Sequence, residues 1–195
     1  MIGEKIGHRL DPYLYSASHK VFGDRRNPNF FTFIGFLSTL VASFFIVTDH
    51  WIGAGMAIIL SGIFDLFDGA MARRSGKVTL FGGFLDSVLD RYSDLLLLLA
   101  FLIYYVRNGT PRLVILTAFV SIGTALIPYT RARAEIAQVP CNIGLMERAE
   151  RIIFLSAGVL FNWIEPVLWI LAVLTHFTVF QRIYNVWRKL RASSK

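Results

Sequence analysis

The chain has 195 residues, of which 55% are hydrophobic and 17% are charged, and its formal net charge is +7. Soluble domains carry roughly 45–50% apolar and about 25% charged residues, so this composition excludes an ordinary soluble domain and indicates an all-α polytopic membrane protein. The positive charge of such a protein is expected to face anionic lipid headgroups, so no nucleic-acid partner is predicted. A single cysteine, Cys141, excludes an intrachain disulfide.

Residues 1–26 are predicted to form a juxtamembrane segment that precedes the main domain. Asp11 and Pro12 suit the N-cap and the first position of a helix, and the apolar stripe that follows is typical of an amphipathic helix on the membrane surface. The stripe is short, so a solvated leader is the alternative. The segment lacks an uninterrupted apolar core and a small-residue cleavage site, so we expect the first span to be an uncleaved anchor.

Six apolar stretches separated by turn signals predict six transmembrane helices in a domain of residues 27–190, followed by a basic tail at residues 191–195. The expected spans cover residues 30–48, 51–73, 82–106 and 113–129, then a short stretch that ends near 163 and a last one from about 165 to 186. The fourth is expected to continue as a helix beyond its apolar part.

The two ends of these spans differ sharply in their basic residues. The side that holds both termini carries sixteen lysines and arginines, whereas the other side carries only Arg107 and Arg112. Basic residues accumulate in cytoplasmic loops. Both termini are therefore predicted to be cytoplasmic, in a multi-pass protein of the cytoplasmic membrane.

Four aspartates interrupt the apolar sequence at the join between the second and third spans. Asp65 and Asp68 lie near the end of the second span, and Asp86 and Asp90 lie in the first turns of the third. Spacings of three and four residues place each pair on one face of its helix. Because the connecting loop is short, both pairs are expected at the same shallow depth on the cytoplasmic side, where they build one site.

Such a site needs a cation, because each aspartate at a helix centre costs roughly 2.5–3.5 kcal/mol on insertion scales. Carboxylate oxygens favour hard cations, so the sequence predicts Mg²⁺ or Mn²⁺. Four negative charges would be balanced by two divalent ions, which together can clamp a displacement at phosphorus. A structural role, with the aspartates satisfied by Arg73 and Arg91, is the alternative.

A cation transporter that uses the aspartates as an ion path is the alternative from another functional class. It requires polar groups through the full membrane thickness, whereas residues 95–106 carry no charge. Ionisable residues confined to one depth favour an enzyme that acts on a membrane-embedded substrate.

Four arginines are predicted at the cytoplasmic ends of the fourth and fifth spans: Arg131, Arg133, Arg148 and Arg151. A cluster of guanidinium groups near a metal site is typical of a phosphate-binding pocket. Anchoring to anionic lipid is the alternative. Nearby glutamates, such as Glu135, are expected to orient the arginines.

The sequence resembles the CDP-alcohol phosphotransferase (CDP-alcohol phosphatidyltransferase) family. The signature of that family is Asp-x2-Asp-Gly-x2-Ala-Arg-x8-Gly-x3-Asp-x3-Asp. This chain matches every fixed position of the signature: Asp65, Asp68, Gly69, Ala72, Arg73, Gly82, Asp86 and Asp90.

The resemblance implies that the four aspartates hold Mg²⁺ or Mn²⁺ and that Asp90 is also the general base. This base would take a proton from an acceptor hydroxyl, which attacks the lipid-bearing phosphorus of a CDP-lipid and releases CMP. By the same analogy, the residues that line the nucleotide site are Asn29, Thr32, Gly69, Ala72, Arg73, Thr79 and Gly82. Asp94 lies outside the signature and is expected to support the site from behind.

The segments around the four arginines look like the phosphatidylinositol phosphate synthase branch of the family, which implies that they bind the phosphate of inositol phosphate. A phosphatidylglycerophosphate synthase, which uses glycerol-3-phosphate, needs the same arginines and is the alternative. The donor is expected to be CDP-diacylglycerol or a related CDP-lipid, archaeal-type lipids included. Resemblance also implies a homodimer.

Overall fold

The computed structural model describes residues 28–75, 79–141 and 143–193 of the chain. Its elements are α2 (Pro28–Val47), α3 (Trp51–Ser75), α4 (Leu80–Arg107), α5 (Pro111–Ile136), α6 (Arg148–Leu160) and α7 (Ile164–Ser193). All the regular structure in the described residues is helical, so the expected all-α fold is confirmed. The amphipathic helix predicted within residues 1–26 lies outside the described residues.

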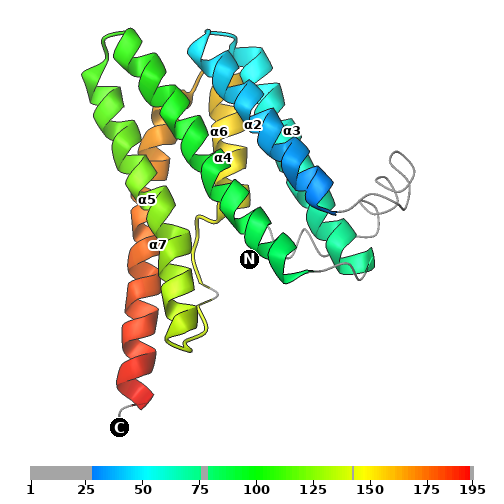
Figure 1. The fold of residues 1–195 in the computed structure, drawn as a ribbon. Coiled ribbons are helices and arrows are strands. Elements are labelled where there is room, and N and C mark those ends of the chain that lie inside the picture. The colour runs from blue at the N-terminus through cyan, green and yellow to red at the C-terminus, as the bar shows by residue number, and fades with distance from the viewer. Residues whose placement is uncertain (1–27, 76–78, 142, 194–195) are drawn as a thin grey trace.

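Two outer pairs of helices flank an inner pair. Helices α5 and α7 lie side by side on one edge of the bundle and α2 and α3 on the other, with α4 and α6 between them (Figure 1). In the bundle, α4 contacts α2 and α5, and α6 contacts α3 and α7. The contacts therefore run around a closed ring, and both central helices can present side chains to the interior.

Local sequence explains the sharp connections between the helices. The turn between α2 and α3 passes through Asp49, whose φ of 62° lies in the left-handed region that aspartate tolerates better than most residues. The hydroxyl of Thr79 caps α4 by accepting a hydrogen bond from the backbone N–H of Gly82 at 2.9 Å. Pro111 occupies the start of α5, where its missing N–H has no cost.

Four described helical segments are long and apolar enough to cross a membrane: 29–47, 51–71, 111–136 and 164–192. Helix α4 has 28 residues but carries three aspartates and Arg91 among its first 15. Helix α6 has only 13 residues and measures about 20 Å, whereas a hydrocarbon core is about 30 Å thick. It ends at Leu160, close to the expected end of the fifth span.

The apolar core fills one half of the bundle. Its largest buried side chains include Ile46, Ile58, Phe101 and Leu168, from four different helices. They lie in the second half of α2, the first half of α3, the second half of α4 and the first half of α7, which is the end remote from the aspartates. The other half of the bundle combines buried apolar side chains, such as Phe31 and Met71, with buried polar ones, such as Asp68 and Arg182.

Candidate active site

Three of the four predicted aspartates meet at the end of the bundle where α3 stops and α4 starts. One carboxylate oxygen from each of Asp65, Asp68 and Asp86 lies within 4.8 Å of the others. Asp68 is buried, and the other two are partly buried. The spacing of the motif and the short connection thus bring ligands from two helices to one point.

The chemistry of this group fits a hard divalent cation. Oδ2 of Asp68 and Oδ1 of Asp86 are buried and have no hydrogen-bond partner. A buried carboxylate oxygen without a partner is costly. Mg²⁺ and Mn²⁺ prefer an all-oxygen ligand set of this kind. The three aspartates are therefore close enough together to bind one metal ion, and the ion would satisfy the two carboxylate oxygens that lack a hydrogen-bond partner.

Asp90 lies beside this group but has a different partner. Its Oδ1 is 2.8 Å from Nη1 of Arg148, and the same nitrogen pairs with Oδ1 of Asp65. Arg91 approaches the other oxygen of Asp90 at 3.7 Å. The fourth predicted ligand is thus held by arginine side chains, at the edge of the three-carboxylate group.

Asp94, one turn beyond Asp90 on α4, is buried and holds the first two turns of α6. Its Oδ2 accepts a hydrogen bond from Nη2 of Arg151 at 2.5 Å, and its Oδ1 lies 3.7 Å from Nε of Arg148. Arg151 also donates to the backbone carbonyl of Met146 at 3.3 Å. Asp94 therefore supports the site from behind, as expected, and Arg148 and Arg151 face the aspartates.

Predicted nucleotide-binding residues surround the same end of α3 and α4. A side chain on Gly82 would lie 2.8 Å from Oγ1 of Thr79 and 3.0 Å from Oδ1 of Asn29, so glycine lets α2 approach the start of α4. Thr32 is buried on α2, one turn from Asn29. Gly69 is partly buried on α3 beside Asp68, whereas the side chains of Ala72 and Arg73 lie outside the described part.

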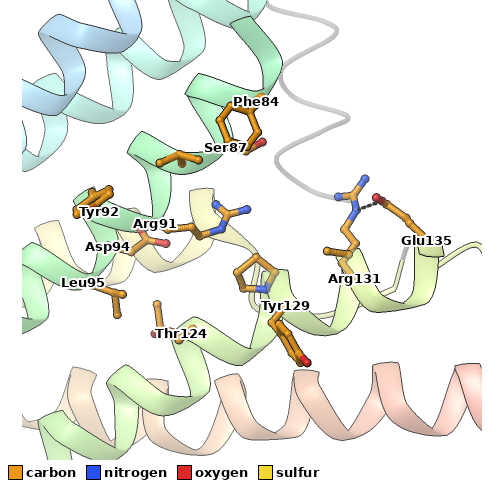
Figure 2. Close-up of a pocket in the computed structure, with 14 residues that line it drawn as sticks. Phe84, Ser87, Arg91, Tyr92, Asp94, Leu95, Thr124, Tyr129, Arg131 and Glu135 are labelled. Atoms are coloured by element: carbon orange, nitrogen blue, oxygen red, sulfur yellow. Dashed lines mark hydrogen bonds and ion pairs between the residues drawn. The ribbon is translucent and has the colours of Figure 1, made fainter. Parts of the chain in front are cut away.

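A cavity of about 720 Å³ opens between α4 and α5. Asp94 and Arg91 line its α4 side, and Tyr129, Arg131 and Glu135 line its α5 side (Figure 2). Nε of Arg131 lies 3.1 Å from Oε1 of Glu135, which is the orienting pair expected from the sequence. Arg91 and Arg131 thus line the same cavity as Asp94, the residue that contacts the arginines of α6.

The structure divides the four predicted acceptor arginines. Arg131 lines the cavity, whereas Arg133 is exposed and is not among its lining residues. Arg148 and Arg151 point to the aspartates instead of lining the cavity. Arg91, which the sequence analysis weighed only as a counter-ion, takes the place opposite Arg131.

Sequence reasoning missed Arg182, which is 2% exposed in the middle of α7. Its guanidinium donates to the backbone carbonyls of Ile143 at 2.9 Å and Ile127 at 2.5 Å, and it lies 3.6 Å from Glu147. A lone arginine within an apolar stretch was the signal, because an ionisable residue at such a position is functional by default.

Comparisons with known proteins identify the family of the chain. A family model described as CDP-alcohol phosphatidyltransferase matches residues 25–181. An archaetidylinositol phosphate synthase of Pyrococcus horikoshii is 39% identical over 164 residues, which are 84% of this chain and 85% of that protein. A phosphatidylinositol phosphate synthase of Mycobacteroides abscessus is 36% identical over 169 residues, 82% of this chain and 76% of that protein.

The fold is similar to solved structures as well. The crystal structure of Mycobacterium tuberculosis phosphatidylinositol phosphate synthase with CDP-DAG bound has a TM-score of 0.79 and 27% identity, covering 92% of this chain and 94% of that one. A structure of the same mycobacterial enzyme with manganese and citrate also has a TM-score of 0.79 and 27% identity, covering 89% and 88% of the two chains.

Proposed function

This chain belongs to the CDP-alcohol phosphatidyltransferase family and is a metal-dependent membrane transferase, and we propose that its acceptor is inositol phosphate. The reaction moves the lipid-phosphate group of CDP-diacylglycerol, or of a related CDP-lipid, to an acceptor hydroxyl and releases CMP. The observation that carries the metal-dependent reaction is the group of three carboxylates from α3 and α4, with two buried oxygens that lack partners. Because the chain belongs to this family of transferases, the alternative of a cation transporter is set aside.

Asp65, Asp68 and Asp86 would hold the first ion, and Asp90 would share a second with them. Bound there, Mg²⁺ or Mn²⁺ would polarise the diphosphate and neutralise the charge that develops on the leaving CMP. Asp90 takes the proton of the acceptor hydroxyl onto a carboxylate oxygen. The hydroxyl oxygen forms a new bond to the lipid-bearing phosphorus, and the bond from that phosphorus to CMP breaks, with the electron pair leaving on CMP.

The nucleotide is proposed to bind where α2 approaches the α3–α4 join. Asn29 and Thr79 converge there around Gly82, and Thr32 lies one turn further along α2. We assign Gly69, Ala72 and Arg73 to the same site because they continue α3 past Asp68. This placement puts the diphosphate beside the carboxylate group and the lipid chains toward the surrounding membrane.

The acceptor is proposed to bind in the cavity between α4 and α5. Arg91 and Arg131 offer positive charge to its phosphate, and Asp94 connects the cavity to the catalytic aspartates. Of the other acceptor arginines, Arg151 positions Asp94, and Arg133 adds positive charge on the exposed surface of α5. The relatives named archaetidylinositol phosphate synthase and phosphatidylinositol phosphate synthase favour inositol phosphate over glycerol-3-phosphate as the acceptor.

We further propose that all six helices cross or enter the cytoplasmic membrane, with both termini and the active site on the cytoplasmic side and the protein a homodimer. Four spans are supported by length and composition. Helix α4 places its aspartates in one half and an uncharged run, 95–106, in the other. The excess of basic residues on one side supports the orientation.

The test is a transfer assay with the purified full-length chain in lipid nanodiscs, CDP-diacylglycerol or its archaeal counterpart, and Mn²⁺ or Mg²⁺. Inositol phosphate and glycerol-3-phosphate are supplied separately, and both CMP and the lipid product are measured. CMP release with inositol phosphate, and little with glycerol-3-phosphate, is expected. The reverse preference would refute the acceptor assignment, and no CMP with either acceptor would refute the proposed transfer.

A further inference from the structure

Arg148 is the first residue of α6, and its side chain reaches both helices that carry the aspartates. Its Nη1 atom pairs with Oδ1 of Asp65 on α3 and lies 2.8 Å from Oδ1 of Asp90 on α4. The side chain is only 14% exposed, so the contact is inside the bundle. One positively charged group thus bridges two carboxylates from different helices.

This bridge has the geometry that a divalent ion would also adopt. Asp65 belongs both to the three-carboxylate group and to the bridge, whereas Asp90 belongs only to the bridge. Two metal ions in one site share ligands and lie about 3.5–4 Å apart. The position for a second ion that uses Asp65 and Asp90 therefore overlaps the place of the Arg148 guanidinium. Two cations cannot hold the same carboxylate oxygens without strong repulsion.

We propose that the Arg148 guanidinium and the second divalent ion compete for the space between Asp65 and Asp90, so that Arg148 controls how readily the second ion binds. The inference rests on the proposed metal site and adds a regulatory step to it. The first ion is held by Asp65, Asp68 and Asp86, and the second binds only when the guanidinium leaves Asp90.

Asp94 gives the displaced guanidinium a place to go. Its Oδ1 is already 3.7 Å from Nε of Arg148, and it is buried one turn further along α4 than Asp90. Arg148 can therefore turn toward Asp94 and remain paired inside the protein, since a short rotation costs far less than exposing an unpaired buried charge. Arg151 already holds Asp94 at 2.5 Å, so the carboxylate stays in position to receive it.

Competition of this kind lowers the apparent affinity for the second ion by the fraction of molecules in which Asp90 is accessible. If Arg148 bridges the carboxylates about nine-tenths of the time, its removal tightens the second ion roughly tenfold. Removal also leaves the carboxylates to repel one another when no metal is present. The variant should therefore be less stable in chelator and gain more stability from metal than the wild-type protein.

The experiment titrates Mn²⁺ into the full-length chain in nanodiscs and follows bound Mn²⁺ by electron paramagnetic resonance, with thermal unfolding measured in parallel. Wild type is compared with Arg148→Gln, which removes the charge, and with Arg148→Lys, which keeps a charge but not the planar fork. Arg112→Gln is the matched control, because it removes an arginine paired with Glu165 at the opposite end of the bundle. No substrate is needed for either readout.

The expected result is a second Mn²⁺ that binds Arg148→Gln about tenfold more tightly than the wild type, with a spin-coupled signal at lower Mn²⁺, an intermediate value for Arg148→Lys and no change in the control. The competition is overturned if the affinity for the second ion is unchanged or weaker in both Arg148 variants. It is also overturned if the wild type and both variants bind only one ion. If Arg148→Gln fails to fold, the shift in Arg148→Lys decides. Wild type that binds no Mn²⁺ would refute the metal site itself.

Discussion

Arg182 donates a hydrogen bond of 2.5 Å to the backbone carbonyl of Ile127, the residue directly before the proline inside α5. The same guanidinium donates to the carbonyl of Ile143 in the segment that leads into α6. One buried side chain of α7 therefore fixes both the helix that carries Arg131 and the approach to Arg148. Arg182 therefore connects the helix that lines the cavity between α4 and α5 with the segment that leads to Arg148.

Replacing Arg182 should therefore destabilise the whole polar half of the bundle. We expect Arg182→Gln to lower the free energy of unfolding by about 2–4 kcal/mol, because it removes the buried charged donor that the carbonyls of Ile127 and Ile143 accept from. Thermal unfolding followed by tryptophan fluorescence measures the loss. Arg188→Gln, an exposed position two turns later on α7, is the control and should change little. Equal stability of the two variants would contradict the role given to Arg182.

Removal of the proposed base should stop the chemistry and spare donor binding. In Asp90→Asn we expect kcat to fall by roughly 10²–10⁴, the usual contribution of general-base catalysis. Binding of the CDP-lipid, measured by CMP competition or by thermal shift, should persist. Asp49→Asn, at an exposed turn on the far end of the bundle, should keep full activity. Turnover near the wild-type rate in Asp90→Asn would exclude Asp90 as the base.

Asp68 offers a separate test of the metal site, because its buried Oδ2 has no protein partner. Asp68→Asn keeps the shape of the side chain and removes the negative charge. Losing even an indirect support of a metal ligand costs about 10–100-fold in affinity, and we expect at least that loss for the first Mn²⁺. Equilibrium titration with Mn²⁺ measures it. Unaltered Mn²⁺ affinity would place the ion elsewhere.

The acceptor cavity predicts different effects for two neighbouring arginines. Arg131→Ala should raise the KM for inositol phosphate roughly 10–100-fold, since a charge-assisted hydrogen bond contributes about 1.5–3 kcal/mol. The KM for the CDP-lipid should stay within about twofold by the same reasoning, because Arg131 lies on the acceptor side. Arg133→Ala, on the same helix but outside the cavity lining, should have the smaller effect. Parallel rises in both KM values would refute the assignment.

Gly82 tests the proposed nucleotide site. A methyl group there would meet Oγ1 of Thr79 at 2.8 Å and Oδ1 of Asn29 at 3.0 Å, so Gly82→Ala must push one of them away. We expect weaker CDP-lipid binding, seen as a higher donor KM, with little change in the acceptor KM. Gly83→Ala is the matched control, since a methyl group at that position meets nothing within 4 Å. Equal donor KM values for the two variants would argue against nucleotide binding at this join.

The sequence was sufficient to predict that Asp65, Asp68 and Asp86 would meet. Their spacing selects one face of each helix, and the short loop leaves α3 and α4 little freedom in relative position. Membership of the family followed from the same residues and is confirmed. The all-helical fold followed from composition and from the turn signals that separate the apolar stretches.

The residues that pair with Arg148 and Arg151 could not be predicted from the sequence. Their spacing shows that they share a helix face, but not which groups that face meets. Packing of α6 against α3 and α7 decides this, and such contacts between elements far apart in the chain leave no periodic pattern. Arg151 illustrates the consequence: its substitution would remove the hydrogen-bond donor to Oδ2 of the buried Asp94, so a loss of activity there would not report on acceptor binding alone.

The packed apolar half of the bundle has a consequence for the membrane as a whole. Side chains such as Phe101 and Leu168 are fully buried in this half, and in the proposed orientation the aspartates face one side of the membrane only. Each turnover would then exchange one headgroup for another within a single leaflet, and the product lipid would be formed in that leaflet. Its appearance in the opposite leaflet would require a separate flipping activity, and the two monolayers would differ in composition for as long as synthesis outpaced that transfer.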